Sequence, residues 1–136
     1  MRVLAIAVCL LVVTACAEKS PSGPTVSFNQ QVALAPNEIA TVDGTSVRLQ
    51  FVTVTGDSRC PADVLCIQGG DALVEVRASS GSNSTTTYQL HTGNSSLASA
   101  THDSVRFSLV QLQPYPFSSR TISPDEYRAT LEITRP

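Results

Sequence analysis

The sequence predicts an all-β fold, a single small antiparallel sandwich or barrel of about six to eight short strands. Apolar residues alternate with polar ones at period two over several segments, as in strands that bury one face. Turn-forming residues separate these segments at intervals of roughly 8–12 residues. A length of 136 residues fits one domain better than two.

The alternating segments follow one another along the chain with turns between them. Asp43-Gly44 is a tight-turn dipeptide that precedes the longest segment, and a polar stretch at 91–104 is expected to be a loop. The chain has no Trp, three Tyr and four Phe, so Val and Leu must form most of the core. The segments expected to form strands are 32–34, 39–42, 47–55, 72–77, 86–90 and 105–112.

The last segment carries signals for both a helix and a strand. Ser123-Pro124-Asp125-Glu126 is typical of a helix start, with a capping residue, proline in the first turn and two acids. Residues 127–134 alternate apolar and polar side chains as a strand does. We therefore expect one helical turn that leads into a final strand.

The N-terminus has the features of an export signal. Met1-Arg2 is followed by eleven residues, 3–13, without a charge. As a helix this run spans roughly 16 Å, about half of a bilayer core, so it predicts a secretory signal and not a transmembrane helix.

A cysteine lies directly behind this apolar run. Val13-Thr14-Ala15-Cys16 resembles the bacterial lipobox, an apolar residue and two small ones before a cysteine. The resemblance implies that Cys16 is diacylated, becomes the first residue of the mature protein and is acylated again on its amine. The alternative is plain secretion, because Ala15-Cys16-Ala17 also fits a cleavage site that leaves no lipid.

These features divide the chain into a signal peptide at 1–15, a lipidated cysteine with a flexible tether at 16–25, and a β-rich domain at 26–136. The tether is polar and rich in Pro, Gly and Ser. Two or three acyl chains would hold such a domain stably on a membrane. The expected location is the bacterial cell envelope, lipid-anchored and extracytoplasmic. Ala17 stands where an Asp would resemble an inner-membrane retention signal, so the outer membrane is favoured in a cell with two.

Two of the four cysteines remain in the folded domain, since Cys9 lies in the signal peptide and Cys16 is assigned to the lipid. Cys60 and Cys66 are near each other and are exported, which predicts a structural disulfide. A redox-active pair would need two intervening residues where this chain has five. A thiolate metal site would need further ligands, and the two histidines lie more than twenty residues away.

The most distinctive stretch runs from Asp57 to Ala72 and reads Asp-Ser-Arg-Cys-Pro-Ala-Asp-Val-Leu-Cys-Ile-Gln-Gly-Gly-Asp-Ala. It resembles a signature of small secreted bacterial proteins and lipoproteins of unknown function. Pro114-Tyr115-Pro116 and the closing Tyr127-Arg128-Ala129 are also similar to that family. Gln68 stands where the family usually has Trp. The resemblance implies a β-rich envelope domain with a Cys60–Cys66 bridge, and it implies no activity.

The polar residues of this stretch admit three interpretations. Asp57, Arg59, Asp63 and Gln68 are the candidate residues of a binding loop that the disulfide stiffens. The plainer interpretation is a disulfide-pinned corner in which Arg59 pairs with nearby aspartates. A calcium site from Asp57, Asp63 and Asp71 is the third, although their spacing lacks the pattern of known calcium loops.

The sequence offers no catalytic constellation. His91 and His102 are the general-base candidates near neutral pH, and both lie in the polar stretch 91–104. There is no Gly-x-Ser-x-Gly elbow, P-loop, dinucleotide fingerprint or zincin motif. We therefore expect neither an enzyme nor a bound cofactor or metal. After residue 16 the chain carries eight Lys and Arg against eleven Asp and Glu, which argues against nucleic-acid binding.

The predicted function is a non-catalytic envelope domain, attached to the membrane by its N-terminal lipid, that binds another envelope protein or a small ligand. The alternative is a secreted inhibitor that presents the Cys60–Cys66 loop, with Arg59, to a protease or another hydrolase. A hydrolase based on His91 and His102 would require the two side chains to converge in one pocket.

Overall fold

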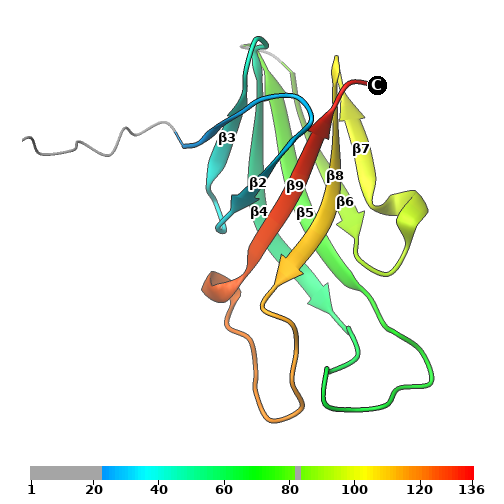
Figure 1. Cartoon of the computed structure of the whole chain (residues 1–136). Helices are drawn as coiled ribbons and strands as arrows, with labels where there is room; N and C mark the ends of the chain where they lie inside the picture. The colour runs from blue at the N-terminus through cyan, green and yellow to red at the C-terminus, as the bar shows by residue number, and fades with distance from the viewer. Residues whose placement is uncertain (1–22, 82–83) are drawn as a thin grey trace, which may run out of the picture.

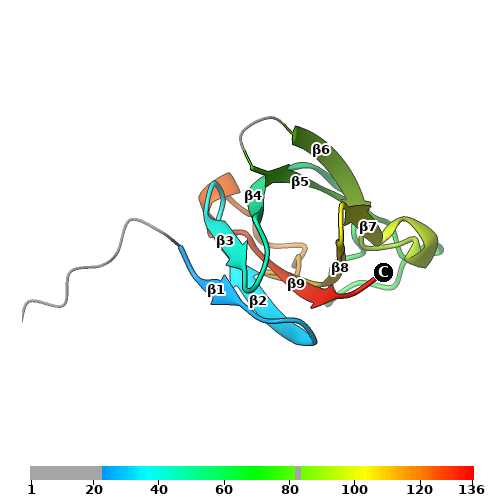
Figure 2. The same ribbon diagram turned by 90° about the horizontal axis from the view of Figure 1, so that it is seen from above.

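The computed structural model describes residues 23–81 and 84–136, which form two β-sheets packed face to face (Figures 1 and 2). The predicted signal peptide, Cys16 and most of the tether lie outside the described residues. The elements in chain order are β1 (Thr25–Val26), β2 (Gln30–Leu34), β3 (Ile39–Val42), β4 (Val47–Asp57), β5 (Ala72–Ser80), β6 (Ser84–His91), the 3-10 helix η1 (Ser95–Leu97), β7 (Ser99–His102), β8 (Val105–Gln113), the 3-10 helix η2 (Pro124–Glu126) and β9 (Arg128–Thr134).

The two sheets confirm the all-β prediction and decide for the sandwich over the barrel. One sheet has the strand order β1-β3-β4-β5-β6 and the other has β2-β9-β8-β7. Neighbouring strands are antiparallel except β1 and β3, which are parallel. No strand pair joins the two sheets within the described ranges, so the barrel is not closed.

The described residues form nine strands where the sequence predicts six to eight, because two short strands carry little alternation. β1 has two residues, and β7 has four within the stretch that the sequence analysis assigns to a loop. The ambiguous C-terminal segment is as expected. η2 is a single turn, in which the Ser123 amide donates to the Glu126 carboxylate at 2.7 Å, and β9 follows it directly.

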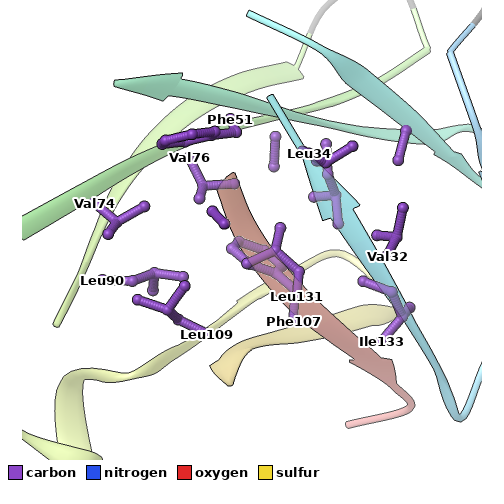
Figure 3. Packing of buried hydrophobic residues seen from close by; sticks show 14 of the residues in the cluster. Val32, Leu34, Phe51, Val74, Val76, Leu90, Phe107, Leu109, Leu131 and Ile133 are labelled. Atoms are coloured by element: carbon purple, nitrogen blue, oxygen red, sulfur yellow. The ribbon is translucent and has the colours of Figure 1, made fainter. Parts of the chain in front are cut away.

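The core lies between the sheets and consists mainly of Val and Leu, with Phe51 and Phe107 as its largest members (Figure 3). β5 illustrates the period-two pattern, because Ala72, Val74, Val76 and Ala78 are fully buried while the residues between them are not. The alternation read from the sequence therefore reports the inner face of each strand.

Two long loops meet at one end of the sandwich (Figure 1). β4 leads into residues 58–71 at that end, and β8 leads into residues 114–123. The C-terminus lies toward the other end, near the turn between β7 and β8. Gly23 lies against Ile39, at the start of β3. The distinctive sequence motif thus occupies the end of the sandwich away from the C-terminus.

Candidate functional site

The disulfide between Cys60 and Cys66 is present, with a Cα–Cα distance of 6.0 Å, and this prediction is confirmed. Between the two cysteines the chain makes one tight turn, in which the Val64 amide donates to the Pro61 carbonyl at 3.1 Å. At the base of the loop the Cys60 amide donates to the Gly69 carbonyl at 2.9 Å. The loop is therefore fixed both at its neck and by the covalent bridge.

Gly70 allows the two arms of this loop to approach each other closely. Its φ is +70°, and a Cβ at this position would lie 1.8 Å from the Ser58 carbonyl oxygen. The Ser58 amide donates to the Asp71 carbonyl at 2.7 Å in the same region. A side chain at position 70 would separate the arms, so their close approach requires glycine there.

Arg59 is buried and binds groups of the second sheet. Its guanidinium donates to both carboxylate oxygens of Asp57, at 2.8 and 2.7 Å. It also donates to the Leu112 carbonyl at 2.7 Å and to the Pro114 carbonyl at 3.0 Å. Its outer face lies over the Tyr115 ring, 5.3 Å from the ring centre. Arg59 therefore ties the disulfide loop to the end of β8, and only 6% of its side chain is exposed.

Asp57 is the partner that makes this burial of Arg59 possible. Its carboxylate also accepts a hydrogen bond from the Tyr127 hydroxyl at 2.9 Å. Burial alone would raise the pKa of the Asp57 carboxyl, but the hydrogen bonds from Arg59 and Tyr127 outweigh burial and hold the pKa below its usual 3.8. Burial, together with the bond to this carboxylate, raises the pKa of Tyr127 to about 12.

Asp63 attaches the disulfide loop to the neighbouring loop 114–123. Its carboxylate accepts hydrogen bonds from the Ser118 amide at 2.9 Å and from the Ser118 hydroxyl at 2.5 Å. These bonds lower the pKa of the Asp63 carboxyl. The Ala62 amide also donates to the Pro116 carbonyl at 2.9 Å. The two loops thus lie side by side and hold each other.

Asp71 has the same role on the other side of the motif. It accepts hydrogen bonds from the Gly93 amide at 2.7 Å and the Thr92 hydroxyl at 3.2 Å, and it lies 2.6 Å from His91 Nδ1. Burial would raise the pKa of the Asp71 carboxyl, but these contacts, led by the Gly93 amide, lower it. The turn after β6 is therefore fixed to the start of β5.

The polar residues of the motif are thus used inside the molecule, as the pinned-corner interpretation describes. Of the candidate binding residues, the side chains of Asp57, Arg59 and Asp63 have internal partners. Gln68 is exposed and has no hydrogen-bond partner among the described residues. Asp57, Asp63 and Asp71 bind separate partners and do not assemble a calcium site. Across residues 23–81 and 84–136 no group of three His, Cys, Asp or Glu could hold a metal ion.

The surface that sequence reasoning missed is apolar. Leu65 and Ile67 are 102% and 105% exposed, and three further large apolar side chains at this end are about half exposed. The hydrogen bonds between the two loops bring these residues to one end of the sandwich. Together they form what we call the tip surface: Val64, Leu65, Ile67, Tyr115 and Phe117. An apolar Val-Leu-Cys-Ile run inside a segment too rich in turns to be a strand was the signal in the sequence.

A small open groove of about 270 Å³ lies beside the tip surface. Its floor is the end of β8, residues 109–113, which lies beyond the point where β7 stops pairing at Ser108. Arg59, Thr92 and Tyr115 form its walls. The Arg59 guanidinium donates a hydrogen bond to the Leu112 carbonyl at this open strand edge. The edge is therefore partly protected from pairing with a strand of another chain.

The two histidines do not converge. His91 lies at the end of β6, against Asp71 and opposite Leu73 at the start of β5. His102 is buried near the other end of the sandwich, where its Nδ1 is 3.2 Å from the Tyr88 hydroxyl. The neighbouring Asp103 bonds Ser80 at the far end of β5. The arrangement that a hydrolase based on both histidines requires is therefore not met.

Comparisons of the chain with protein-family models, with characterised proteins and with solved structures found no match. The resemblance of the central motif to small secreted bacterial proteins accordingly stays a prediction. In the part of the chain that the structure describes, no helix has the length and apolar character needed to cross a membrane.

Proposed function

We propose that this chain is a lipid-anchored, extracytoplasmic envelope domain that acts by contact and not by catalysis, and that it binds another envelope component through the tip surface. The observation that carries the proposal is the full exposure of Leu65 and Ile67 on a loop that is fixed at several points. Bacterial export and acylation at Cys16 are the second part of the proposal, and the lipobox supports them.

Exposed aliphatic side chains are ordinary when they are scattered, but here they are gathered and held in place. Five of the seven large apolar side chains that are exposed in the described residues belong to the tip surface. A flexible loop could turn such side chains inward, whereas the disulfide and the Ala62–Pro116 and Asp63–Ser118 hydrogen bonds prevent that. A rigid apolar surface loses little conformational entropy on binding, which favours recognition.

Acylation is tested by growing producing cells with labelled palmitate and following incorporation into the chain. Cys16→Ala should abolish the label because the acceptor thiol is gone. The matched control is Cys60→Ala/Cys66→Ala, which removes the other two cysteines of the exported chain and should keep the label. Unchanged labelling of Cys16→Ala would refute the anchoring part of the proposal.

Binding through the tip surface is tested by chemical crosslinking in intact producing cells. Leu65→Ser/Ile67→Ser should remove the crosslinked product, and both changes are at exposed positions that leave the core intact. Leu97→Ser is the control, because Leu97 is an exposed apolar side chain of η1, outside the tip surface. Equal crosslinking of the wild type and the double variant would refute the role of the tip surface.

The inhibitor alternative retains one supporting observation, the protruding Leu65 on a disulfide-bridged loop. Arg59 cannot enter the specificity pocket of a protease without breaking its bonds to Asp57 and to two carbonyls of the chain. An inhibitor of this form would therefore present Leu65. A panel of proteases that prefer large apolar residues tests this alternative. Stoichiometric inhibition that is lost in Leu65→Ala would establish the inhibitor function, and the absence of inhibition would exclude it.

A further inference from the structure

We infer that the tip surface docks onto an uncharged, apolar surface of a different envelope protein, one that lies on the side of the domain away from the anchoring membrane. The inference rests on the proposed anchoring through Cys16 and adds the chemistry and the position of the partner. The arguments that follow favour such a protein over two other occupants, the anchoring bilayer and a second copy of this chain.

The chemistry of the tip surface selects an uncharged partner. Residues 60–70 contain one charged side chain, Asp63, which is bonded to Ser118, and residues 114–119 contain none. The nearest guanidinium groups are also engaged, Arg59 with Asp57 and Arg120 with Glu126. No free cation of the two loops is available for a phosphate or an anionic headgroup. The complementary surface is therefore an apolar depression that receives Leu65 and Ile67.

The length of the tether places the tip surface away from the bilayer. Gly23 lies against Ile39, which pairs with Gln50, so the tether joins the domain at the level of Gln50 on β4. From Gln50 to Asp57 the strand runs about 23 Å toward the tip, and the loop continues beyond it. Seven residues link Cys16 to Gly23, with a typical span of about 15 Å and a limit near 25 Å.

A tip pressed onto the anchoring bilayer would need this tether to run back along the domain at nearly full extension. With the tether relaxed, the attachment point is closer to the membrane than the tip surface is. The loops then project outward, since the tether joins the domain at the level of Gln50 and the loops lie beyond Asp57. The anchoring bilayer is therefore a poor occupant of the tip surface.

A second copy of the chain is a less favourable occupant for a related reason. Two domains that meet tip to tip have their Gly23 residues on opposite sides of the contact, each more than about 23 Å from it. With relaxed tethers, both domains hold their tip surfaces away from the membrane, so the two surfaces would meet only if both domains lay along the membrane. A different protein, located farther from the membrane, satisfies both constraints.

The test uses the acylated chain in its producing cells, with a photo-crosslinking amino acid in place of Ile67 or, as a control, of Leu97. We expect a discrete adduct with one other protein from position 67 and none from position 97. The adduct should vanish when Leu65→Ser is added. The captured protein, once purified, should bind the domain at least tenfold less tightly when Leu65→Ser/Ile67→Ser is present, since two buried side chains are truncated.

Three outcomes would overturn the inference: an adduct with lipid, an adduct with a second copy of this chain, or no adduct from an acylated chain. The proposed function fails separately. If Cys16 carries no label, the anchoring proposal is lost, and the orientation argument is overturned with it even when a protein adduct forms. If Cys16 is labelled and the adduct is lipid, the anchoring stands and only the inference about the partner falls.

Discussion

Arg59→Ala should destabilise the domain severely, although Arg59 belongs to the motif that most resembles a binding loop. The side chain is 6% exposed and donates four hydrogen bonds, two to the Asp57 carboxylate and one each to the Leu112 and Pro114 carbonyls. Truncation leaves the part-buried carboxylate with the Tyr127 hydroxyl and the backbone amide of residue 59 as its remaining partners.

Two estimates of the loss, which both include the Arg59–Asp57 contacts, agree. Four hydrogen bonds at a net contribution of about 1 kcal/mol each give about 4 kcal/mol. Removing one partner of a buried ion pair costs about 3–5 kcal/mol, because the other charge stays desolvated. For a domain of this size, such a loss lowers the melting temperature by roughly 12–20 °C.

Urea unfolding followed by circular dichroism measures the change in the free energy of unfolding. Arg48→Ala is the matched control, since Arg48 lies on the same strand with an exposed side chain, and it should cost less than about 0.5 kcal/mol. Arg59→Lys keeps the charge but cannot bind both carboxylate oxygens, so its stability should fall between those of the wild type and Arg59→Ala. If Arg59→Ala costs no more than Arg48→Ala, the structural role assigned to Arg59 is wrong.

Three further predictions concern the same end of the sandwich. Reducing the Cys60–Cys66 bridge should lower the free energy of unfolding by about 2 kcal/mol, because the closed loop is short. Urea unfolding with and without dithiothreitol should therefore show a smaller loss than Arg59→Ala, and a larger loss would contradict this order of contributions. Folding lowers the pKa values of Asp57 and Asp71, so their contribution to stability is full above about pH 4 and is lost as the pH falls through the lowered values. The urea midpoint should therefore decrease as the pH is lowered below about 4, and it should decrease less steeply in Asp57→Asn. Equal slopes for the wild type and Asp57→Asn would count against the Asp57 contacts. Tyr127→Phe removes the hydroxyl that binds Asp57 and should cost about 1 kcal/mol in the same unfolding assay. In a spectrophotometric titration it should also remove the tyrosine that titrates at about pH 12, whereas Tyr88→Phe should leave that tyrosine in place.

Local sequence patterns predicted the fold well because each strand buries one face. The alternation at Ala72, Val74 and Val76 is present in the structure as a buried row, and Asp43-Gly44 is a turn in which Gly44 has a φ of +71°. The same patterns missed β7, whose four residues include one buried side chain, His102. A short edge strand is defined by its neighbour in space, and period-two alternation over four residues cannot reveal it.

The candidate site was harder to predict, because hydrogen-bond partners distant in the sequence decide which side chains are used internally. The sequence neighbours of Arg59 do not indicate that the carbonyls of residues 112 and 114 lie beside its guanidinium. Nothing near Asp63 indicates Ser118, which is fifty-five residues away. The Arg59–Asp57 pair was among the interpretations because it is local, whereas the long-range contacts that bury the pair depend on the packing of the two sheets.

These contacts reverse the roles that residue chemistry alone suggests for the motif. Charged side chains are usually taken as the contact residues of a loop, yet Asp57, Arg59 and Asp63 hold the loop in place. The apolar residues between and beside the cysteines, which are of types usually buried in the core, are exposed to solvent. Since the disulfide and the polar contacts fix the backbone, Leu65 and Ile67 cannot turn inward. The internal charges are therefore the reason that an apolar surface can persist at this end of the domain.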